Sequence, residues 1–232
     1  MFQELKLSSG EIKSVIISII LISVIFSYND RNLQFAWNSW LNNLLLAFSI
    51  TSIIILIYII GIKFSSFKQG NLSTFSCMDL KADYLRAFIA FILMLISNGL
   101  LYFTPIYSLK HEKIRKLGQR YEKEKEFEIA LSLFSGLFLV LILLLLFNFF
   151  NIQLGILISV WFLAWNLVPI ASSSGTDLFF LSRPLYFFSI CFFPLTIILT
   201  LVLPSLLSLI LSLIFAAVVF IYYFFKVESG IK

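Results

Sequence analysis

Long uncharged apolar runs constrain this chain more than any other feature. One of them extends from 185 to 225 without a charged residue and is interrupted by Pro194 and Pro204. A helix of about 20 apolar residues crosses the roughly 30 Å hydrocarbon core of a bilayer. Of the 232 residues, 60% are hydrophobic and only 12% are charged, whereas a soluble domain typically carries about 25% charged residues. The sequence therefore predicts an integral membrane protein.

The apolar runs predict one all-α, polytopic membrane domain over residues 1–232, with about six transmembrane helices. The tail after 185 is long enough for two crossings, so we place a turn near Leu203-Pro204-Ser205. Acidic and basic residues precede the first run and no small-residue cleavage site follows it, so we interpret it as a retained span, not a signal peptide. The predicted transmembrane segments are 14–28, 43–62, 129–150, 152–172, 185–203 and 205–225.

Segment 86–109 allows two interpretations, because it is long enough to span but contains a turn signal. Asn98-Gly99 is a turn dipeptide in its middle, and the aromatic stretch after it, with Pro105, favours an extended strand over a helix. The segment therefore either crosses the membrane or enters it and returns to the same face. Non-helical backbone at membrane depth needs protein around it, so a returning segment must be packed inside a bundle.

The distribution of basic residues favours the second interpretation. If 86–109 returns to the face it entered from, every Lys and Arg except Arg31 lies on one side of the membrane. Cytoplasmic loops carry such an excess of Lys and Arg. We therefore predict a re-entrant helix–strand hairpin in a multi-pass protein of the cell membrane. The N-terminus and most basic loops are then cytoplasmic, including a charged loop at 110–128.

The residue counts exclude most catalytic chemistry. The single histidine, His111, lies in the charged segment, and the two cysteines, Cys77 and Cys191, are far apart and outside any Cys-x-x-Cys pattern. Serine nucleophiles therefore have no histidine base beside them, and no histidine–cysteine metal cluster can be assembled. Phosphate-binding glycine motifs are absent from the sequence. We predict no enzymatic activity, no metal, no cofactor and no nucleic-acid partner.

Three local patterns follow one another along the chain. They are "YIIGIKFSSFKQG" at 58–70, "LLYFTPIYS" at 100–108 and "WNLVPIASSSG" at 165–175. In this order they resemble the site-2 protease family of intramembrane zinc metalloproteases, especially its compact archaeal-type members. The family patterns are His-Glu-x-x-His followed by Lys-Phe and Gly, an apolar strand leading to Pro-Gly, and Asn-x-x-Pro-x-x-x-Leu-Asp-Gly. The resemblance covers roughly residues 8–195.

The resemblance also implies that the active site has been lost. Tyr58, Ile59 and Ile62 stand where the family has its first histidine, glutamate and second histidine, and Ser174 replaces the aspartate that completes the zinc site. A hydrolytic zinc site needs three protein ligands, typically imidazole and carboxylate, and a carboxylate base for the bound water. These four residues supply neither. The resemblance therefore implies a site-2-protease-like scaffold that purifies without stoichiometric zinc.

The polar insert at 164–177 has two interpretations. It is either the family's broken-helix element, kept after its ligand was lost, or a helix C-terminus capped by Asn and Ser with Pro and Gly after it. On the first interpretation it faces the re-entrant hairpin across a groove, and we expect Asn166 to bond freed carbonyls or the Pro105 strand. The expected groove residues are Asn166, Pro169, Gly175, Asn98, Gly99 and Pro105.

Ser132, Ser135 and Gly136 form a small-residue face, which is typical of closely packed membrane helices. Together these features favour a catalytically inactive pseudoprotease that binds transmembrane segments of other proteins. The alternative is a structural accessory subunit of a larger membrane complex, since the chain is small, very apolar and poor in loops. A transporter or channel component is a third hypothesis, disfavoured because the sequence lacks repeats and charge within its apolar runs. In each case the partners are lipids and other transmembrane proteins.

Overall fold

The computed structural model describes residues 7–28, 37–77, 81–97, 99–104, 107–113, 125–170 and 173–228. The described chain is mostly helical, with one small sheet. Its helices are α1 (Ser9–Ser27), α2 (Trp37–Lys68), α3 (Lys81–Ile96), α4 (Glu126–Phe149), α5 (Gln153–Leu167), α6 (Ser174–Leu181), α7 (Arg183–Leu199) and α8 (Ser205–Tyr223), the last continuing into a π-helical turn at Phe224–Glu228. The strands are β1 (Asn71–Cys77) and β2 (Tyr107–Lys113).

Four helices are long and apolar enough to cross a membrane: α1, α2, α4 and the Ser205–Lys226 helix that contains α8. They correspond to four of the six predicted segments, which supports a membrane protein. The other two predicted segments fall on α5 and α7, which are shorter apolar helices. The helix α5 ends at Leu167, before Pro169, because the residue that precedes a proline is disfavoured in the helical conformation. The apolar tail does form two helices, and α8 begins at Ser205 after Pro204 as expected.

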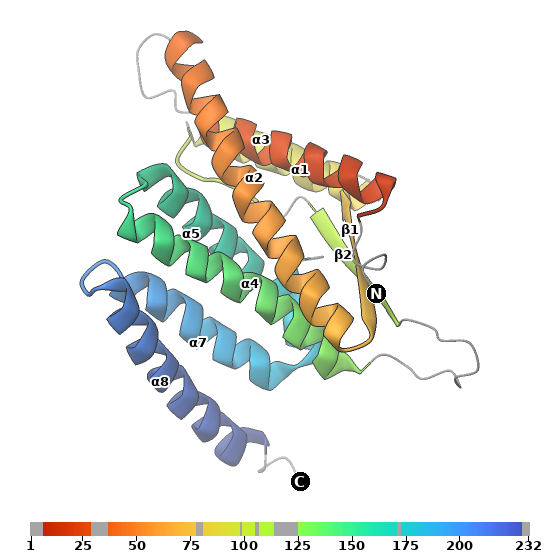
Figure 1. The fold of residues 1–232 in the computed structure, drawn as a ribbon, viewed down its shortest axis with the longest axis vertical. Helices are drawn as coiled ribbons and strands as arrows, with labels where there is room; N and C mark the ends of the chain where they lie inside the picture. Colours follow the sequence, from red (N-terminus) through yellow and green to blue (C-terminus); the bar gives the residue numbers. More distant parts are fainter. Residues whose placement is uncertain are drawn as a thin grey trace.

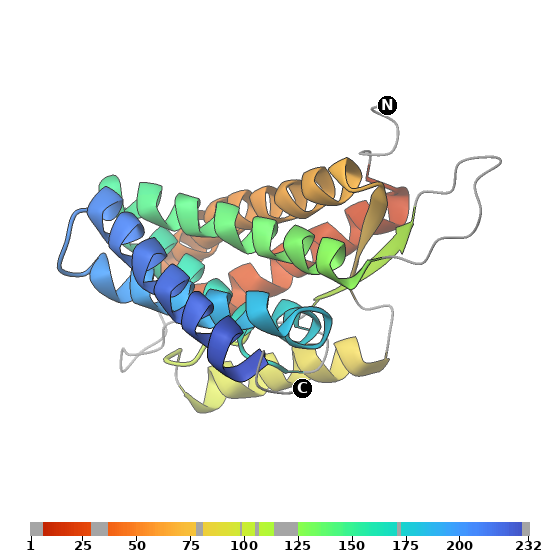
Figure 2. The ribbon, with the colours of Figure 1, turned by 90° about the horizontal axis from the view of Figure 1, so that it is seen from below.

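The helices form a bundle in which α2, α4 and α5 lie next to one another, and α7 and α8 form a hairpin at one side (Figure 1). The helix α1 packs against α2 and also contacts α3. Seen from below, α3 lies along the outside of the bundle, while the sheet lies beside the ends of α2 and α4 (Figure 2). The buried apolar core therefore sits mainly between α1, α2, α4, α5 and α7.

The helices α2 and α4 cross at two glycines. A Cβ atom on Gly61 would lie 2.9 Å from the Cα of Gly136, and a Cβ on Gly136 would lie 3.0 Å from the carbonyl oxygen of Tyr58. The hydroxyl of Ser135 donates a hydrogen bond of 2.9 Å to the carbonyl of Gly61, across the same crossing. The prediction of a small-residue packing face on this helix is confirmed, and its partner is α2.

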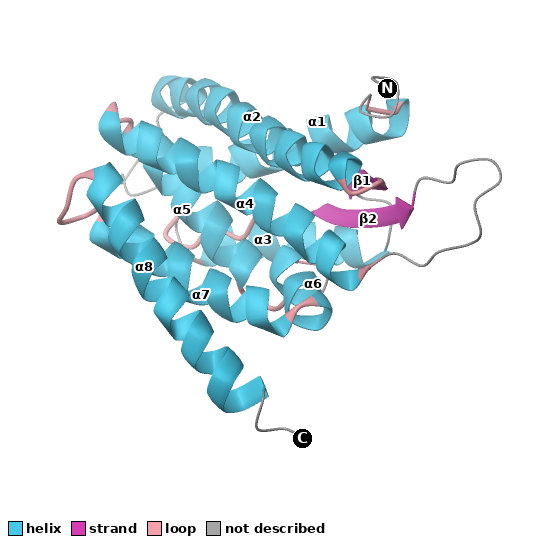
Figure 3. Ribbon diagram, turned by 60° about the horizontal axis from the view of Figure 1, so that its bottom comes forward, coloured by secondary structure: helices cyan, strands magenta, loops and turns pink. Residues whose placement is uncertain are grey.

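The sheet was not expected in an all-α fold. The strands β1 and β2 pair antiparallel, with Asn71 opposite Lys113 and Cys77 opposite Tyr107 (Figure 3). The predicted strand is therefore displaced along the chain, since residues 101–104 are not in a strand and β2 starts at Tyr107. The predicted loop at 110–128 is wrong at both ends, because β2 covers its first residues and α4 begins at Glu126. Residues 114–124 lie outside the described part of the chain.

His111 provides a pH probe of this sheet. It lies opposite Ser73, and burial lowers the pKa of its imidazole from 6.5 to about 4. Both ring nitrogens are buried without a hydrogen-bond partner, so the folded state favours the neutral ring. Below pH 6.5 the unfolded chain binds a proton that the folded chain excludes, so stability falls as the pH falls towards 4.

We expect this effect to remove about 2 kcal/mol of stability between pH 7.5 and 5. The variant His111→Gln should lose that component, because glutamine does not titrate. Thermal unfolding in detergent at the two pH values measures it. Equal pH dependence of the wild type and His111→Gln would contradict the burial of a neutral imidazole.

Candidate functional site

Tyr58 and Ser174 form a hydrogen bond in the interior, although 116 positions separate them in the sequence. Tyr58 lies in the middle of α2, and Ser174 is the first residue of α6. Both side chains are buried, and the ring of Tyr58 also packs edge-on against Phe162 of α5 with a centroid distance of 5.2 Å. The structure therefore brings together two of the four positions that the resemblance assigns to a degenerate zinc site.

The other two positions are also buried on α2. Ile59 and Ile62 belong to the hydrophobic core, with exposed fractions of 4% and 1%. The side chain of Ile62 contacts α4 at the glycine crossing, because its Cγ1 atom would lie 2.6 Å from a Cβ on Gly136. Aliphatic packing thus occupies the two positions that the resemblance assigns to the family's catalytic glutamate and second histidine.

Asn166 extends the polar contact into α5. The Ser174 hydroxyl donates to the Asn166 side-chain oxygen at 3.3 Å, and the Asn166 amide nitrogen donates to the Phe162 carbonyl at 2.8 Å. The Ser174 hydroxyl therefore bonds both Tyr58 and Asn166. These hydrogen bonds form one connected chain, in which neighbouring bonds polarise one another.

Gly175 lets α6 pack directly onto the end of α5. A Cβ atom there would lie 2.6 Å from the carbonyl carbon of Leu167 and 2.8 Å from the carbonyl oxygen of Asn166. Ser173 caps α6 by accepting the backbone N–H of Thr176, and its hydroxyl donates to the carbonyl of Val168 at 2.8 Å. The polar insert is therefore a helix C-terminus followed by a capped helix start, held together by backbone contact.

The segment at 99–104 lies against α5. The indole N–H of Trp165 donates to the carbonyl of Tyr102. The Phe103 ring lies 4.9 Å from that of Trp165, and the Tyr102 ring lies 5.9 Å from that of Trp161. The two elements expected to share an inner surface are thus in contact. Trp165 makes this hydrogen bond, which was not expected, and the expected contact of Asn166 with the Pro105 strand falls on residues outside the described part of the chain.

Of the four other expected groove residues, two are described in the structure and two are not. Gly99 is buried with a φ of 72°, a left-handed conformation that glycine adopts readily. Pro169 is exposed and contributes by ending α5. Asn98 and Pro105 lie outside the described residues. Of the six groove residues, Asn166 and Gly175 are therefore the two that the structure places at the polar contact.

The buried contact does not fit a zinc ion. Tyr58, Ser174 and Asn166 offer two hydroxyls and an amide oxygen, and these groups already bond one another. Structural and catalytic zinc sites use thiolate, imidazole or carboxylate ligands. Within the described ranges, no group of three His, Cys, Asp or Glu residues could hold a metal. The arrangement can hold helices α2, α5 and α6 together, but it offers no nucleophile with a base.

Sequence reasoning missed an ion pair between Glu11 and Lys63. The Lys63 ammonium lies 2.8 Å from a carboxylate oxygen of Glu11, and both side chains are largely buried. Ser8 and Glu11 carry a readable signal, because Ser-x-x-Glu before an apolar run is a capping box, and the structure forms one at the start of α1. No local pattern indicates that Lys63 is the partner, since the pair joins two helices.

Comparison of this chain with protein-family models, with curated proteins and with solved structures finds no match. The functional argument therefore rests on the contacts inside the chain.

Proposed function

We propose that the chain is a catalytically inactive, site-2-protease-like membrane protein that binds transmembrane segments of other proteins. The observation that carries the proposal is the hydrogen bond between Tyr58 and Ser174. The resemblance assigns these positions to the first histidine and to the aspartate of one zinc site, from motifs far apart in the sequence. The contact between these two side chains in the interior supports the alignment of both sequence patterns with the family motifs. The bond between two neutral hydroxyls supports a loss of the metal.

The sheet supports the re-entrant interpretation of 86–109. The chain leaves β1 at Cys77 and re-enters β2 at Tyr107, and these two residues are paired. A segment that starts and ends at one point crosses the membrane an even number of times or not at all. The helix α3, at 16 residues, is also shorter than a usual span. In this topology the N-terminus and the basic loops lie in the cytoplasm of a multi-pass protein with about six crossings.

The proposed client surface is formed by α5 and by the segment at 99–104. Trp161 and Trp165 are half-buried there and pack against Tyr102 and Phe103, and this non-helical backbone needs protein around it. A transmembrane helix of a client would pack next to this backbone and exclude lipid from it. Binding of this kind requires no hydrolysis, which fits a site without ligands or base.

The alternative function is a structural accessory subunit, and α8 favours it. Only 17% of the most apolar part of this helix is buried, compared with 44–56% for the other three membrane-length helices. Its buried residues are small and face α7, where the Ser212 and Thr196 hydroxyls bond at 2.6 Å. The large apolar face of α8 would then contact a fixed partner.

The variant Asn166→Leu tests the proposal. It removes the acceptor of Ser174 and costs about 1–2 kcal/mol, since hydrogen bonds within membranes are modest. We expect it to reduce the yield of co-purified single-span proteins. The matched control is Thr200→Leu, because the Thr200 hydroxyl bonds only the carbonyl of Ile197 in its own helix.

Quantitative mass spectrometry of the purified complexes separates the two functions. A sub-stoichiometric mixture of single-span proteins that decreases in Asn166→Leu but not in Thr200→Leu supports client binding. One partner set at fixed stoichiometry, unaffected by Asn166→Leu, would instead establish the accessory subunit.

A further inference from the structure

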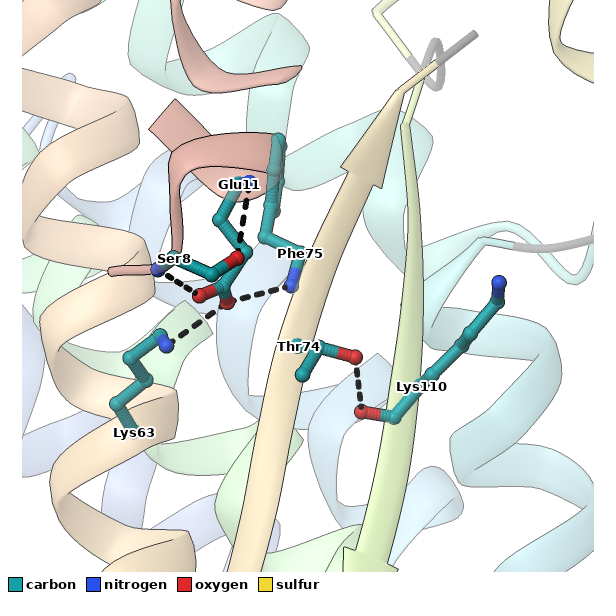
Figure 4. A network of polar contacts seen from close by, with 6 residues as sticks. All are labelled: Ser8, Glu11, Lys63, Thr74, Phe75 and Lys110. Carbon is teal, nitrogen blue, oxygen red and sulfur yellow. Dashed lines mark hydrogen bonds and ion pairs between the residues drawn. The ribbon is translucent and has the colours of Figure 1, made fainter. Parts of the chain in front are cut away.

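One carboxylate ties together three elements beside the sheet. An oxygen of Glu11, on α1, lies 2.8 Å from the ammonium of Lys63 on α2 and accepts the backbone N–H of Phe75 on β1 at 3.1 Å (Figure 4). The other oxygen accepts the backbone N–H of Ser8 at 2.8 Å. The Glu11 side chain therefore holds α1, α2 and β1 together at one point.

The bond to Phe75 closes the outer edge of β1. In an antiparallel pair, alternate residues direct their N–H and C=O groups away from the partner strand. The N–H of Phe75 goes to Glu11, so Phe75 is such an outward residue. On the other side of β1, the Thr74 side-chain hydroxyl donates to the carbonyl of Lys110, its partner residue on β2 (Figure 4). An open edge of this kind pairs readily with another chain. The Glu11 carboxylate occupies the position that the carbonyl of an incoming strand would take.

The sheet is also connected along the chain to the segment that covers α5. β1 pairs with β2, and β2 begins at Tyr107, three positions after the end of the segment at 99–104. That segment lies on Trp161 and Trp165 through Tyr102 and Phe103. The far end of this covering segment is therefore anchored through the sheet, and the sheet is anchored through Glu11.

We propose that the Glu11 carboxylate is a latch that keeps the sheet docked on α1 and α2 and thereby keeps the segment at 99–104 over the aromatic face of α5. The exposed fraction of the Glu11 side chain is 6% and that of Lys63 is 11%. Removing one member of a buried pair leaves an uncompensated buried charge. Loss of the carboxylate therefore releases the sheet and uncovers α5. The latch does not depend on the proposed function. Only the role of α5 as a client surface rests on the proposed function.

Cys77 is a native probe of the docked sheet. Its thiol lies two residues after Phe75 and is 3% exposed. In a Cys191→Ser background it is the only cysteine of the chain, so the rate of labelling by a polar maleimide reports how often the sheet opens. We expect Glu11→Ala to raise that rate about tenfold or more, because opening then no longer requires breaking the ion pair. The matched control is Glu126→Ala, an exposed glutamate in the first turn of α4.

Two further variants keep the test decisive. If Glu11→Ala cannot be purified, Lys63→Met tests the latch in its place. This variant removes the ion pair and leaves the hydrogen bond between Glu11 and the Phe75 N–H available. A rise in Cys77 labelling in this variant supports the latch. The double variant Glu11→Gln/Lys63→Met removes both charges and keeps an acceptor for Phe75, so its labelling rate should return towards that of the wild type.

A disulfide trap reports on the covering segment separately. Phe103→Cys and Trp165→Cys, in a Cys77→Ser/Cys191→Ser background, should crosslink efficiently when Glu11 is present and several-fold less when it is alanine. A wild-type rate of Cys77 labelling in Glu11→Ala or Lys63→Met would overturn the latch. Unchanged crosslinking in Glu11→Ala would overturn its control of the segment at 99–104. Neither readout depends on a client, so both are distinguishable from a failure of the proposed function.

Discussion

Replacing Gly175 with alanine is expected to separate α6 from α5 and to break the polar contact at Tyr58. The added Cβ would meet the carbonyl groups of Leu167 and Asn166, and the carbonyl carbon of Leu167 would be only 2.6 Å away. These are backbone atoms at the end of a helix, so they cannot rotate away as a flexible side chain would. The start of α6 must shift, and Ser174, the residue before, moves with it.

The expected cost is about 3 kcal/mol, which corresponds to a fall in Tm of roughly 6–12 °C. Overpacking contributes one part, and the loss of the buried hydrogen bond between Tyr58 and Ser174 contributes another. Thermal unfolding in detergent, followed by size-exclusion chromatography, measures it.

Gly10→Ala is a closely matched control, because Gly10 and Gly175 are each the second residue of a helix. A Cβ on Gly10 would meet only the hydroxyl of Ser8, at 4.0 Å. Alanine favours a helix over glycine, so this variant should keep or gain up to about 1 kcal/mol. Equal Tm values for the two variants would show that α6 does not rest on α5 as the structure has it.

The membrane-length helices were predictable because each is encoded by a local run. Hydrophobicity over about 20 residues is sufficient to indicate a span, and α1, α2, α4 and α8 each contain such a run. The break between α7 and α8 was also local, since Pro204 cannot continue the preceding helix. The lengths of α2 and α5 were harder to predict from the sequence, because the end of each helix depends on the residues beyond the apolar run.

The sheet could not be predicted, because its stability comes from contacts between distant segments. β1 reads "NLSTFSC" and β2 reads "YSLKHEK", and neither shows the alternation of apolar and polar residues that indicates a strand. β1 contacts α1 and α2, and Glu11 of α1 supplies a hydrogen bond to the edge of the strand that no local signal reveals. The charged β2 sequence is compatible with a solvated loop until its pairing with β1 is known.

Part of the candidate site was expected from the resemblance, which assigns Tyr58 and Ser174 to one site, and the structure places these two side chains in contact. The bond from the Asn166 amide nitrogen to the Phe162 carbonyl of its own helix was not expected. Trp165 donates to the Tyr102 carbonyl in the segment at 99–104, and an indole at that position carries no local sign of its partner.

Gly61→Ala is expected to force α2 and α4 apart and to be nearly as damaging as the change at Gly175. The new Cβ would lie 2.9 Å from the Cα of Gly136 and 3.2 Å from the carbonyl oxygen of Ser135. Both are backbone atoms of α4, so relief requires movement of a whole helix. That movement would also stretch the bond from the Ser135 hydroxyl to the Gly61 carbonyl. In a membrane, close packing and such bonds replace the hydrophobic effect as the forces that hold helices together.

We expect a loss of about 2–3 kcal/mol for Gly61→Ala, measured as Tm in detergent against the same Gly10→Ala control. Gly136→Ala should cost a comparable amount, because its Cβ would lie 3.0 Å from the Tyr58 carbonyl and 2.6 Å from the Ile62 side chain. The double variant decides whether the two glycines form one contact. Once the helices have separated to admit the first methyl group, the second meets less resistance, so the combined cost should fall below the sum of the single costs. Additive costs would mean that each glycine packs against a different neighbour, and the single crossing of α2 and α4 that positions Tyr58 would then be wrong.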